Sequence, residues 1–179
     1  TYAGANGKSV NNYDRRYRGF TTLREAITDS INIVTVKTLA QAGVSLGWQY
    51  VQEYGFTTVD SRDMNEALAL GGITQGVSNL ELTAAYAAIA NQGTYIKPKF
   101  YTKILDHDGN VLIDNTTPES HTVIKDTTAW LLTSAMEDVM TSGTGTSAYF
   151  GSSMAQAGKS GTTTSSRDAL FAGYTPRSE

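Results

Sequence analysis

The sequence predicts an α+β fold in which most of the helices precede the last strands. In the first half of the chain, apolar residues recur at helical spacing behind residues that commonly begin helices. From about residue 100 the pattern changes to β-branched and aromatic residues around a turn signal, and two further strand-like segments, 155–163 and 169–175, end the chain. Because two or three strands make a poor sheet by themselves, we expect other strands to complete it.

Length and composition are those of a globular domain. The chain has 179 residues, of which 40% are hydrophobic and 17% are charged, and its net charge is -3. This charge gives no general attraction to nucleic acid, and the cluster Arg15-Arg16-Tyr17-Arg18 is interpreted as a solvated surface segment. The absence of cysteine excludes disulfides, thiolate nucleophiles and cysteine-ligated metal sites. We expect neither a metal nor a cofactor.

Two short helices are predicted near the N-terminus. Thr22 and Glu25 have the spacing of a capping box, which begins the first helix. Apolar residues within 34–40 predict the second helix, and Gly43 ends it. The junction Ser30-Ile31-Asn32 therefore falls between two helices, where side chains can point into a cleft.

The middle of the chain is predicted to contain two more helices and a glycine-rich turn region. The first of these helices covers 46–54 with Ser45 as its cap. Three glycines within 69–77 favour tight turns over regular structure. A second capping box, at Ser78, begins an alanine-rich helix that continues through Asn91.

A β-hairpin and a long helix are predicted next. Residues 100–105 and 111–113 flank the turn signal Asp108-Gly109-Asn110, which predicts the hairpin. The helix is expected over 127–140, with Asp126 as its cap. Its core-facing side is predicted to consist of Trp130, Leu131, Ala135, Met136 and Val139.

One strand near the C-terminus places a lysine among small polar residues. Alternate residues of a strand share a face, so Ser160, Thr162 and Thr164 form a row of hydroxyls that can bind a carboxylate. Gly161 leaves the backbone open to a ligand, and Lys159 adds a positive charge that stabilises an anion. Taken alone, this segment could equally be an edge strand with a surface lysine.

Ser30 and Asn32 form a second candidate element. A serine hydroxyl can relay a proton, and an asparagine amide can hold a peptide group by donating and accepting at once. By itself the pair is typical of a helix stop. Together with Lys159-Ser160-Gly161, however, it provides two of the three elements, Ser-x-Asn and Lys-Ser/Thr-Gly, that occur in penicillin-binding proteins and serine β-lactamases.

Further motifs extend this match in order from Phe20 onward. They are Leu23-Arg24-Glu25-Ala26, Ala69-Leu70-Gly71-Gly72 through Gly76-Val77, Leu80-Glu81-Leu82 with Ala85-Tyr86, Ala90-Asn91-Gln92-Gly93, Gly143-Thr144-Gly145, and Asp168-Ala169-Leu170-Phe171-Ala172-Gly173-Tyr174-Thr175-Pro176. With them the chain resembles the C-terminal part of the transpeptidase domain of class A, bifunctional penicillin-binding proteins. The resemblance implies the fold of penicillin-binding proteins and serine β-lactamases, an antiparallel sheet flanked by helices, present here only in part.

The resemblance also implies a role for each matching residue. Ser30 would relay a proton to or from the nucleophile and leaving group, Lys159 would interact electrostatically with Ser30, and Asn32 would hold the peptide amide of the substrate. The hydroxyls of Ser160 and Thr162 would bind the terminal carboxylate, and the Thr162 amide would supply half of the oxyanion hole. Further substrate-binding and cleft-border positions are Gly161, Thr164, Thr144, Gly145 and Thr146.

One element of the family pattern is missing from this sequence. The family attacks its substrate with the serine of a Ser-x-x-Lys motif upstream of Ser-x-Asn, and here no serine stands three residues before any lysine. Without that nucleophile there is no acylation. We therefore expect residues 1–179 to be a partial transpeptidase domain that lacks the Ser-x-x-Lys segment and the last strand, begins with an irregular surface segment over 1–20, and is inactive as an isolated chain.

The implied function is peptidoglycan cross-linking by a D,D-transpeptidase that forms a serine acyl-enzyme on D-Ala-D-Ala stem peptides. The expected partners are these stem peptides, β-lactams and the upstream part of the same polypeptide, without nucleic acid. The expected location is the extracytoplasmic face of the bacterial membrane. The longest apolar run, 84–90, is too short to cross a bilayer, so we expect an anchor outside this chain. A non-catalytic β-lactam sensor, a peptidoglycan-binding module and a serine β-lactamase are the alternatives.

Overall fold

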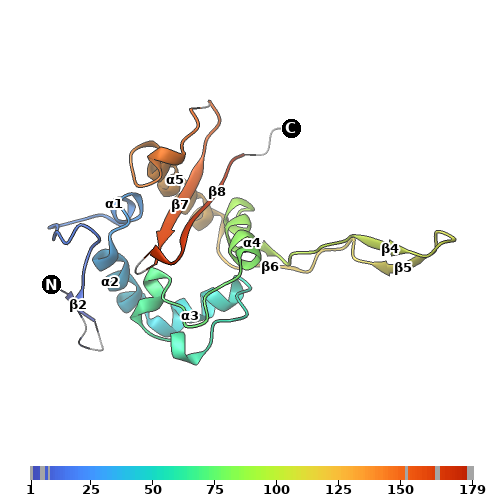
Figure 1. Ribbon diagram of the computed structural model, residues 1–179, viewed down its shortest axis with the longest axis horizontal. Helices are drawn as coiled ribbons and strands as arrows, with labels where there is room; N and C mark the ends of the chain where they lie inside the picture. Colours follow the sequence, from blue (N-terminus) through green and yellow to red (C-terminus); the bar gives the residue numbers. More distant parts are fainter. Residues whose placement is uncertain (1, 5–6, 8, 152, 164–165, 177–179) are drawn as a thin grey trace.

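The computed structural model describes residues 2–4, 7, 9–151, 153–163 and 166–176. These residues form a helical body that carries a two-stranded sheet, and a narrow arm extends from one side of the body (Figure 1). The mixed helix and sheet content agrees with the predicted α+β class. Among the described residues, no helix is long and apolar enough to cross a membrane.

Two helices, α1 (Leu23–Thr28) and α2 (Asn32–Ala42), meet at the junction that contains Ser30. Both halves of the predicted capping box between Thr22 and Glu25 are present. Gly43 follows α2 with a φ of 101°, as expected for a glycine that ends a helix. Ser30 has a φ of 55°, a left-handed conformation that few residues other than glycine adopt. The predicted junction is therefore confirmed, and its backbone turns sharply at the serine.

The central part of the chain consists of α3 (Val44–Glu53), the 3₁₀ turns η1 (Ser61–Asp63) and η2 (Glu66–Leu70), and α4 (Asn79–Ala90). The predicted cap of α3 is wrong, because the helix begins at Val44 and Ser45 lies inside its first turn. The capping box at Ser78 is confirmed. In the glycine-rich region η2 continues to Leu70, and Gly71 then turns the chain with a left-handed φ of 75°.

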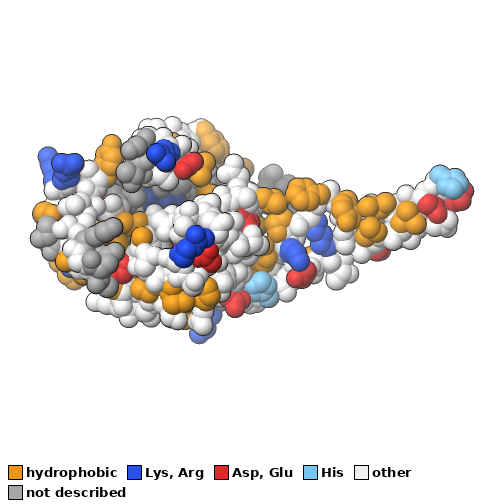
Figure 2. Space-filling view, turned by 60° about the horizontal axis from the view of Figure 1, so that its bottom comes forward, with side chains coloured by type: hydrophobic (Ala, Val, Ile, Leu, Met, Phe, Trp, Pro, Cys, Tyr) orange, Lys and Arg blue, Asp and Glu red, His pale blue; other side chains and the backbone are white. Residues whose placement is uncertain are grey.

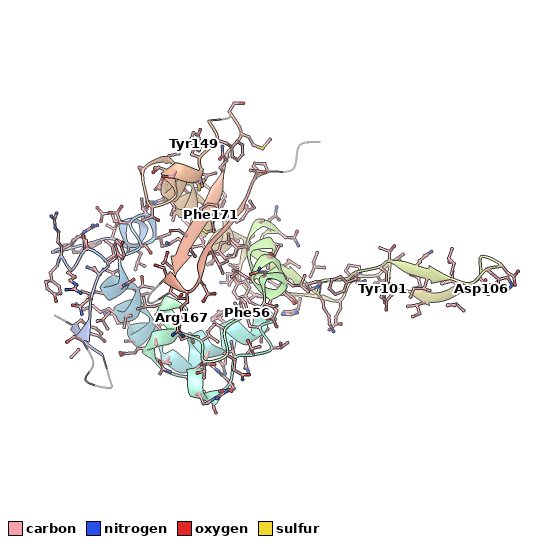
Figure 3. The ribbon with its side chains drawn as sticks, viewed as in Figure 1. Phe56, Tyr101, Asp106, Tyr149, Arg167 and Phe171 are labelled. Atoms are coloured by element: carbon pink, nitrogen blue, oxygen red, sulfur yellow. The ribbon has the colours of Figure 1, made fainter. Side chains whose placement is uncertain are left out.

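The C-terminal sheet pairs β7 (Ala157–Thr162) with the antiparallel strand β8 (Ala169–Tyr174). Gly158 lies opposite Gly173 in this register. The ring of Phe171 crosses both glycines, and a Cβ at Gly158 would lie 2.4 Å from its Cζ atom. Figure 3 shows Phe171 on this sheet. Glycine at position 158 is thus required by the close approach of an aromatic ring from the neighbouring strand.

Helix α5 (Asp126–Thr141) packs against β7. Its buried residues are Ala129, Ala135, Met136, Val139 and Met140. The prediction for Trp130 and Leu131 is wrong, because 68% and 58% of their surfaces are exposed. The buried stripe is centred on Val139 and Met136, so residues 130 and 131 lie on the opposite side of the helix. Asp126 is also not the cap; it is the first helical residue and follows Lys125.

The arm is the predicted hairpin, formed by β4 (Lys103–Leu105) and β5 (Val111–Asp114), and the pair β3 (Thr94–Ile96) and β6 (Ser120–Thr122) joins it to the body. Phe100 and Tyr101 precede the first strand of the hairpin instead of belonging to it. Every residue of β4 and β5 is exposed, and Figure 2 shows apolar side chains along the arm. In Figure 3, Tyr101 lies nearer the body and Asp106 nearer the tip.

The N-terminal segment is irregular, as predicted, apart from the short pair β1 (Tyr2–Ala3) and β2 (Ser9–Val10). It is not confined to the surface, because Asn12 is only 8% exposed and contacts α2. Arg18 is exposed, as the sequence predicts for this cluster. Its guanidinium forms ion pairs with Asp29, at 2.6 Å, and with Asp14, at 3.3 Å.

Candidate active site

The site centres on a contact between two motifs that are distant in the sequence. Nζ of Lys159, on β7, donates to Oγ of Ser30, at the junction of α1 and α2, over 2.9 Å. The same Nζ donates to the carbonyl of Ser160 over 3.2 Å. Lys159 is half-buried, and this burial lowers the pKa of its ammonium group below the ordinary value. The two predicted elements therefore meet, with a partly desolvated cation beside a serine hydroxyl.

Local structure presents Ser30 to the lysine. Ile31 is 3% exposed and anchors the junction in the core, and its N–H donates to the carbonyl of Ala26 over 2.9 Å. Because Ile31 points inward and Ser30 adopts the left-handed conformation, the serine side chain faces outward toward β7. A buried neighbour and a sharp backbone turn thus fix the position of the hydroxyl.

Asn32 is the first residue of α2 and is half-buried. Its Nδ2 donates to the backbone carbonyl of Asn11 over 2.9 Å. Since a carbonyl oxygen only accepts, the amide nitrogen must face Asn11, and this fixes the orientation of the side chain. The acceptor oxygen Oδ1 then lies at the other end of the amide, together with the second N–H of Nδ2.

The loop after α5 approaches β7 from the side. Oγ1 of Thr144 lies 3.1 Å from Oγ of Ser160, and the Thr144 N–H donates to the carbonyl of Thr28 over 3.2 Å. A Cβ at Gly143 would lie 2.3 Å from that same carbonyl oxygen, so the loop needs glycine there. The structure therefore brings Thr144 and Ser160 together, beside the helix that leads to Ser30.

The remaining predicted site residues differ in how they are placed. Gly161 and Thr162 are exposed, and among the described residues, apart from the glycine itself and its chain neighbours, no atom lies within 4 Å of a Cβ built at Gly161. Thr146 is exposed and begins η3 (Thr146–Ala148). Gly145, in contrast, is buried against Val139 and Met140, so it supports the loop and does not line a cleft. The predicted Thr164 lies outside the described residues.

The free edge of β7 exposes main-chain groups. In the described part of the chain β7 pairs only with β8. The Thr163 N–H donates to the carbonyl of Asp168, toward β8, over 3.0 Å. Because successive amides of a strand point to opposite edges, the N–H of Thr162 points away from β8. An extended ligand could therefore align with this edge and use the Thr162 amide as a donor.

An open pocket of about 360 Å³ adjoins Ser30. Part of its lining consists of Ser142, Gly143 and Thr144, and a second wall comes from the N-terminal segment, including Asn12, Asp14 and Arg18. Sequence reasoning missed this N-terminal wall. The segment has neither helical nor strand periodicity, so no sequence signal distinguished Asn12 or Arg18 from surface residues.

Comparisons with known proteins agree with these motifs. The family model described as the penicillin binding protein transpeptidase domain matches residues 1–179. Penicillin-binding protein 1F of Bacillus subtilis is 40% identical over 172 residues, which are 93% of this chain and 23% of that protein. Penicillin-binding protein 1A/1B of the same organism is 32% identical and is covered to 21% of its length. The chain thus spans less than a quarter of these two relatives.

Solved structures share the fold. Penicillin-binding protein 1A from Haemophilus influenzae superposes with a TM-score of 0.80 at 26% identity, over 92% of this chain and 30% of that one. The D,D-transpeptidase domain of a peptidoglycan glycosyltransferase from Eggerthella lenta superposes with a TM-score of 0.76 at 21% identity, over 95% and 49%. These matches confirm the predicted resemblance, and this chain belongs to the transpeptidase-domain family of penicillin-binding proteins.

Proposed function

We propose that this chain forms the wall of a D,D-transpeptidase active site that holds the substrate and moves protons. The observation that carries the proposal is the 2.9 Å contact between Lys159 Nζ and Ser30 Oγ. It joins the Ser-x-Asn and Lys-Ser-Gly motifs into one site, and these are the two motifs of the family pattern that the chain contains. The family name and the name of the Eggerthella lenta domain support the reaction type.

In the proposed reaction a serine outside this sequence attacks the carbonyl between the two D-alanines of a stem peptide. The attack forms an ester and releases D-alanine, whose nitrogen takes up a proton. An amine of a second stem peptide then attacks the ester, and the serine recovers its proton. Ser30 relays these protons, and Lys159 holds the Ser30 hydroxyl in position while its charge stabilises the developing anion.

The substrate contacts come from β7 and α2. The hydroxyls of Ser160 and Thr162 bind the terminal carboxylate, and Thr144 orients Ser160 through the 3.1 Å contact between their oxygens. The Thr162 N–H, on the free edge of β7, donates to the oxyanion. The Asn32 amide binds a peptide group of the stem. β-Lactams acylate the same serine, since they present a strained amide and a carboxylate to the same contacts.

The location follows from this function. Peptidoglycan is assembled outside the cytoplasmic membrane, so we place the domain on the extracytoplasmic face.

Labelling with fluorescent penicillin tests the proposal. We expect the full-length polypeptide that carries this chain to be labelled stoichiometrically, and residues 1–179 alone to take no covalent label, since they contain no Ser-x-x-Lys. A stable label on the isolated chain would overturn the proposal. Labelling that is followed by rapid release of hydrolysed drug would indicate a β-lactamase. Stable labelling without cross-linked product would indicate a sensor or a binding module.

A further inference from the structure

The N-terminal segment caps the helix that begins with Asn32. The first amides of a helix have no partners within it, and the residue before α2, Ile31, has no side-chain oxygen to cap them. Instead, Oδ1 of Asn12 accepts from the N–H of Ile33 over 3.1 Å. Nδ2 of Asn12 donates to the carbonyl of Arg16 over 2.8 Å. A buried asparagine 21 residues upstream thus performs the role of the missing cap.

The same segment holds the junction on both sides of Ser30. After the serine, Asn12 binds the backbone of Ile33, and the Asn11 carbonyl accepts from the side chain of Asn32 over 2.9 Å. Before the serine, Arg18 binds Asp29 over 2.6 Å. Arg18 and Asp29 are both well exposed, so their pair is weak in water. Among the contacts that hold the junction, those of the buried Asn12 are therefore the strongest.

We propose that Asn12 is a positioning residue for the transpeptidase site, acting through the junction Ser30-Ile31-Asn32. Asn12 fixes the start of α2, which sets the direction of the Asn32 amide and the distance between Ser30 and Lys159. The inference rests on the proposed function of that site. Positioning matters because a displacement of about 1 Å in a catalytic group can slow a reaction by about a hundredfold.

The test uses the full-length polypeptide that carries this chain, with the acylation rate measured by fluorescent penicillin. Asn12→Leu keeps the number and branching of the side-chain heavy atoms but removes both hydrogen bonds. We expect acylation to be about tenfold slower. The noncovalent affinity for the fluorescent penicillin is measured separately, before acylation takes place. Asn12→Asp keeps the acceptor for the Ile33 N–H, and negative charge is favourable at a helix N-terminus. It loses the donor to the Arg16 carbonyl, so we expect this variant to recover part of the rate.

Asn65 provides a matched control. Like Asn12, it accepts from an amide at the start of a helical turn, the N–H of Ala67 over 2.9 Å, and donates to a backbone carbonyl, that of Arg62 over 2.9 Å. It contacts none of the proposed site residues in these hydrogen bonds. Asn65 is exposed, so Asn65→Leu should lower the thermal stability by less than Asn12→Leu does and leave the acylation rate unchanged.

A double-mutant cycle separates positioning from a general loss of stability. If Asn12 acts through the junction, Asn12→Leu should cost less rate in an Asn32→Ala background than in the wild type, because one of the two groups that it orients is already gone. Losses that multiply in the double variant, or a wild-type rate in Asn12→Leu, would overturn the inference. If Asn12→Leu does not fold, an Asn12→Asp rate that falls more than tenfold in a folded protein would overturn it as well. Absence of label on the wild-type polypeptide would instead refute the proposed function.

Discussion

Two of the antiparallel strand pairs in the structure have opposite surroundings. The pair β7 and β8 packs on α5, and its lysine is half-buried beside Ser30. The pair β4 and β5 projects from the body, and its lysine, Lys103, is exposed and lies 3.6 Å from Asp114. Both lysines stand on a two-stranded sheet, so strand structure alone does not create the site. The supporting helix and the distant serine convert one of these lysines into a candidate catalytic group.

The largest expected difference between the two pairs is in reactivity. In the full-length polypeptide, Lys159→Ala should slow acylation by fluorescent penicillin at least about a hundredfold, because it removes the charge and the contact that hold Ser30. Lys103→Ala removes an exposed ion pair and should leave the rate unchanged. If Lys159→Ala and the wild type are acylated at equal rates, Lys159 has no role in acylation, and in this respect it does not differ from Lys103.

The next largest difference is in stability. Val139 has no exposed surface and lies on the face of α5 that supports β7. Val139→Ala should lower the free energy of unfolding by about 2 kcal/mol, through lost burial and the cavity that remains. Leu112, on the arm, is 63% exposed, and Leu112→Ala should change this free energy by less than about 0.5 kcal/mol. Denaturant titration of both variants measures the difference, and equal losses would mean that the arm is packed in the intact protein.

The smallest expected difference is in pH dependence. Burial lowers the pKa of Lys159 from its ordinary value of 10.5. Between the lowered pKa and 10.5 the unfolded chain binds a proton that the folded chain has lost, so this group makes the fold more stable as pH rises. In the same window the site loses its charge, and acylation should decline before pH 10.5.

Lys159→Arg tests that assignment, because a guanidinium stays charged throughout this range. Its acylation rate, relative to its own maximum, should decline at a higher pH than that of the wild type. The matched Lys103→Arg variant should keep the wild-type profile. An unchanged alkaline decline in Lys159→Arg would assign the titration to another group.

Interactions between residues that are close in the sequence could be predicted more readily than interactions between distant residues. The capping boxes at Thr22 and Ser78 were predicted because both partners lie within four residues of each other. The junction at Ser30 was predicted from the helices that flank it. Trp130 and Leu131 were assigned to the wrong side, because apolar spacing along α5 could not tell which of two overlapping faces meets β7.

The N-terminal wall of the site depends on long-range contacts, which the sequence did not predict. The contact of Asn12 with Ile33 spans 21 residues and that of Lys159 with Ser30 spans 129. The second pair was identified from the sequence because both partners belong to motifs with recognisable chemistry. Asn12 belongs to no such motif, so only the folded arrangement reveals it as the cap of α2.

The free edge of β7 has a consequence for the evolution of drug resistance. Its donors and acceptors are peptide groups, and the one substitution that deletes a donor is proline, which removes the N–H and also disrupts the strand. Selection for escape from a β-lactam that aligns with this edge therefore acts mainly indirectly, by shifting the path of the strand or by altering neighbours such as Thr144. Under the proposed function any such shift also disturbs the natural substrate, because both ligands would use the same backbone.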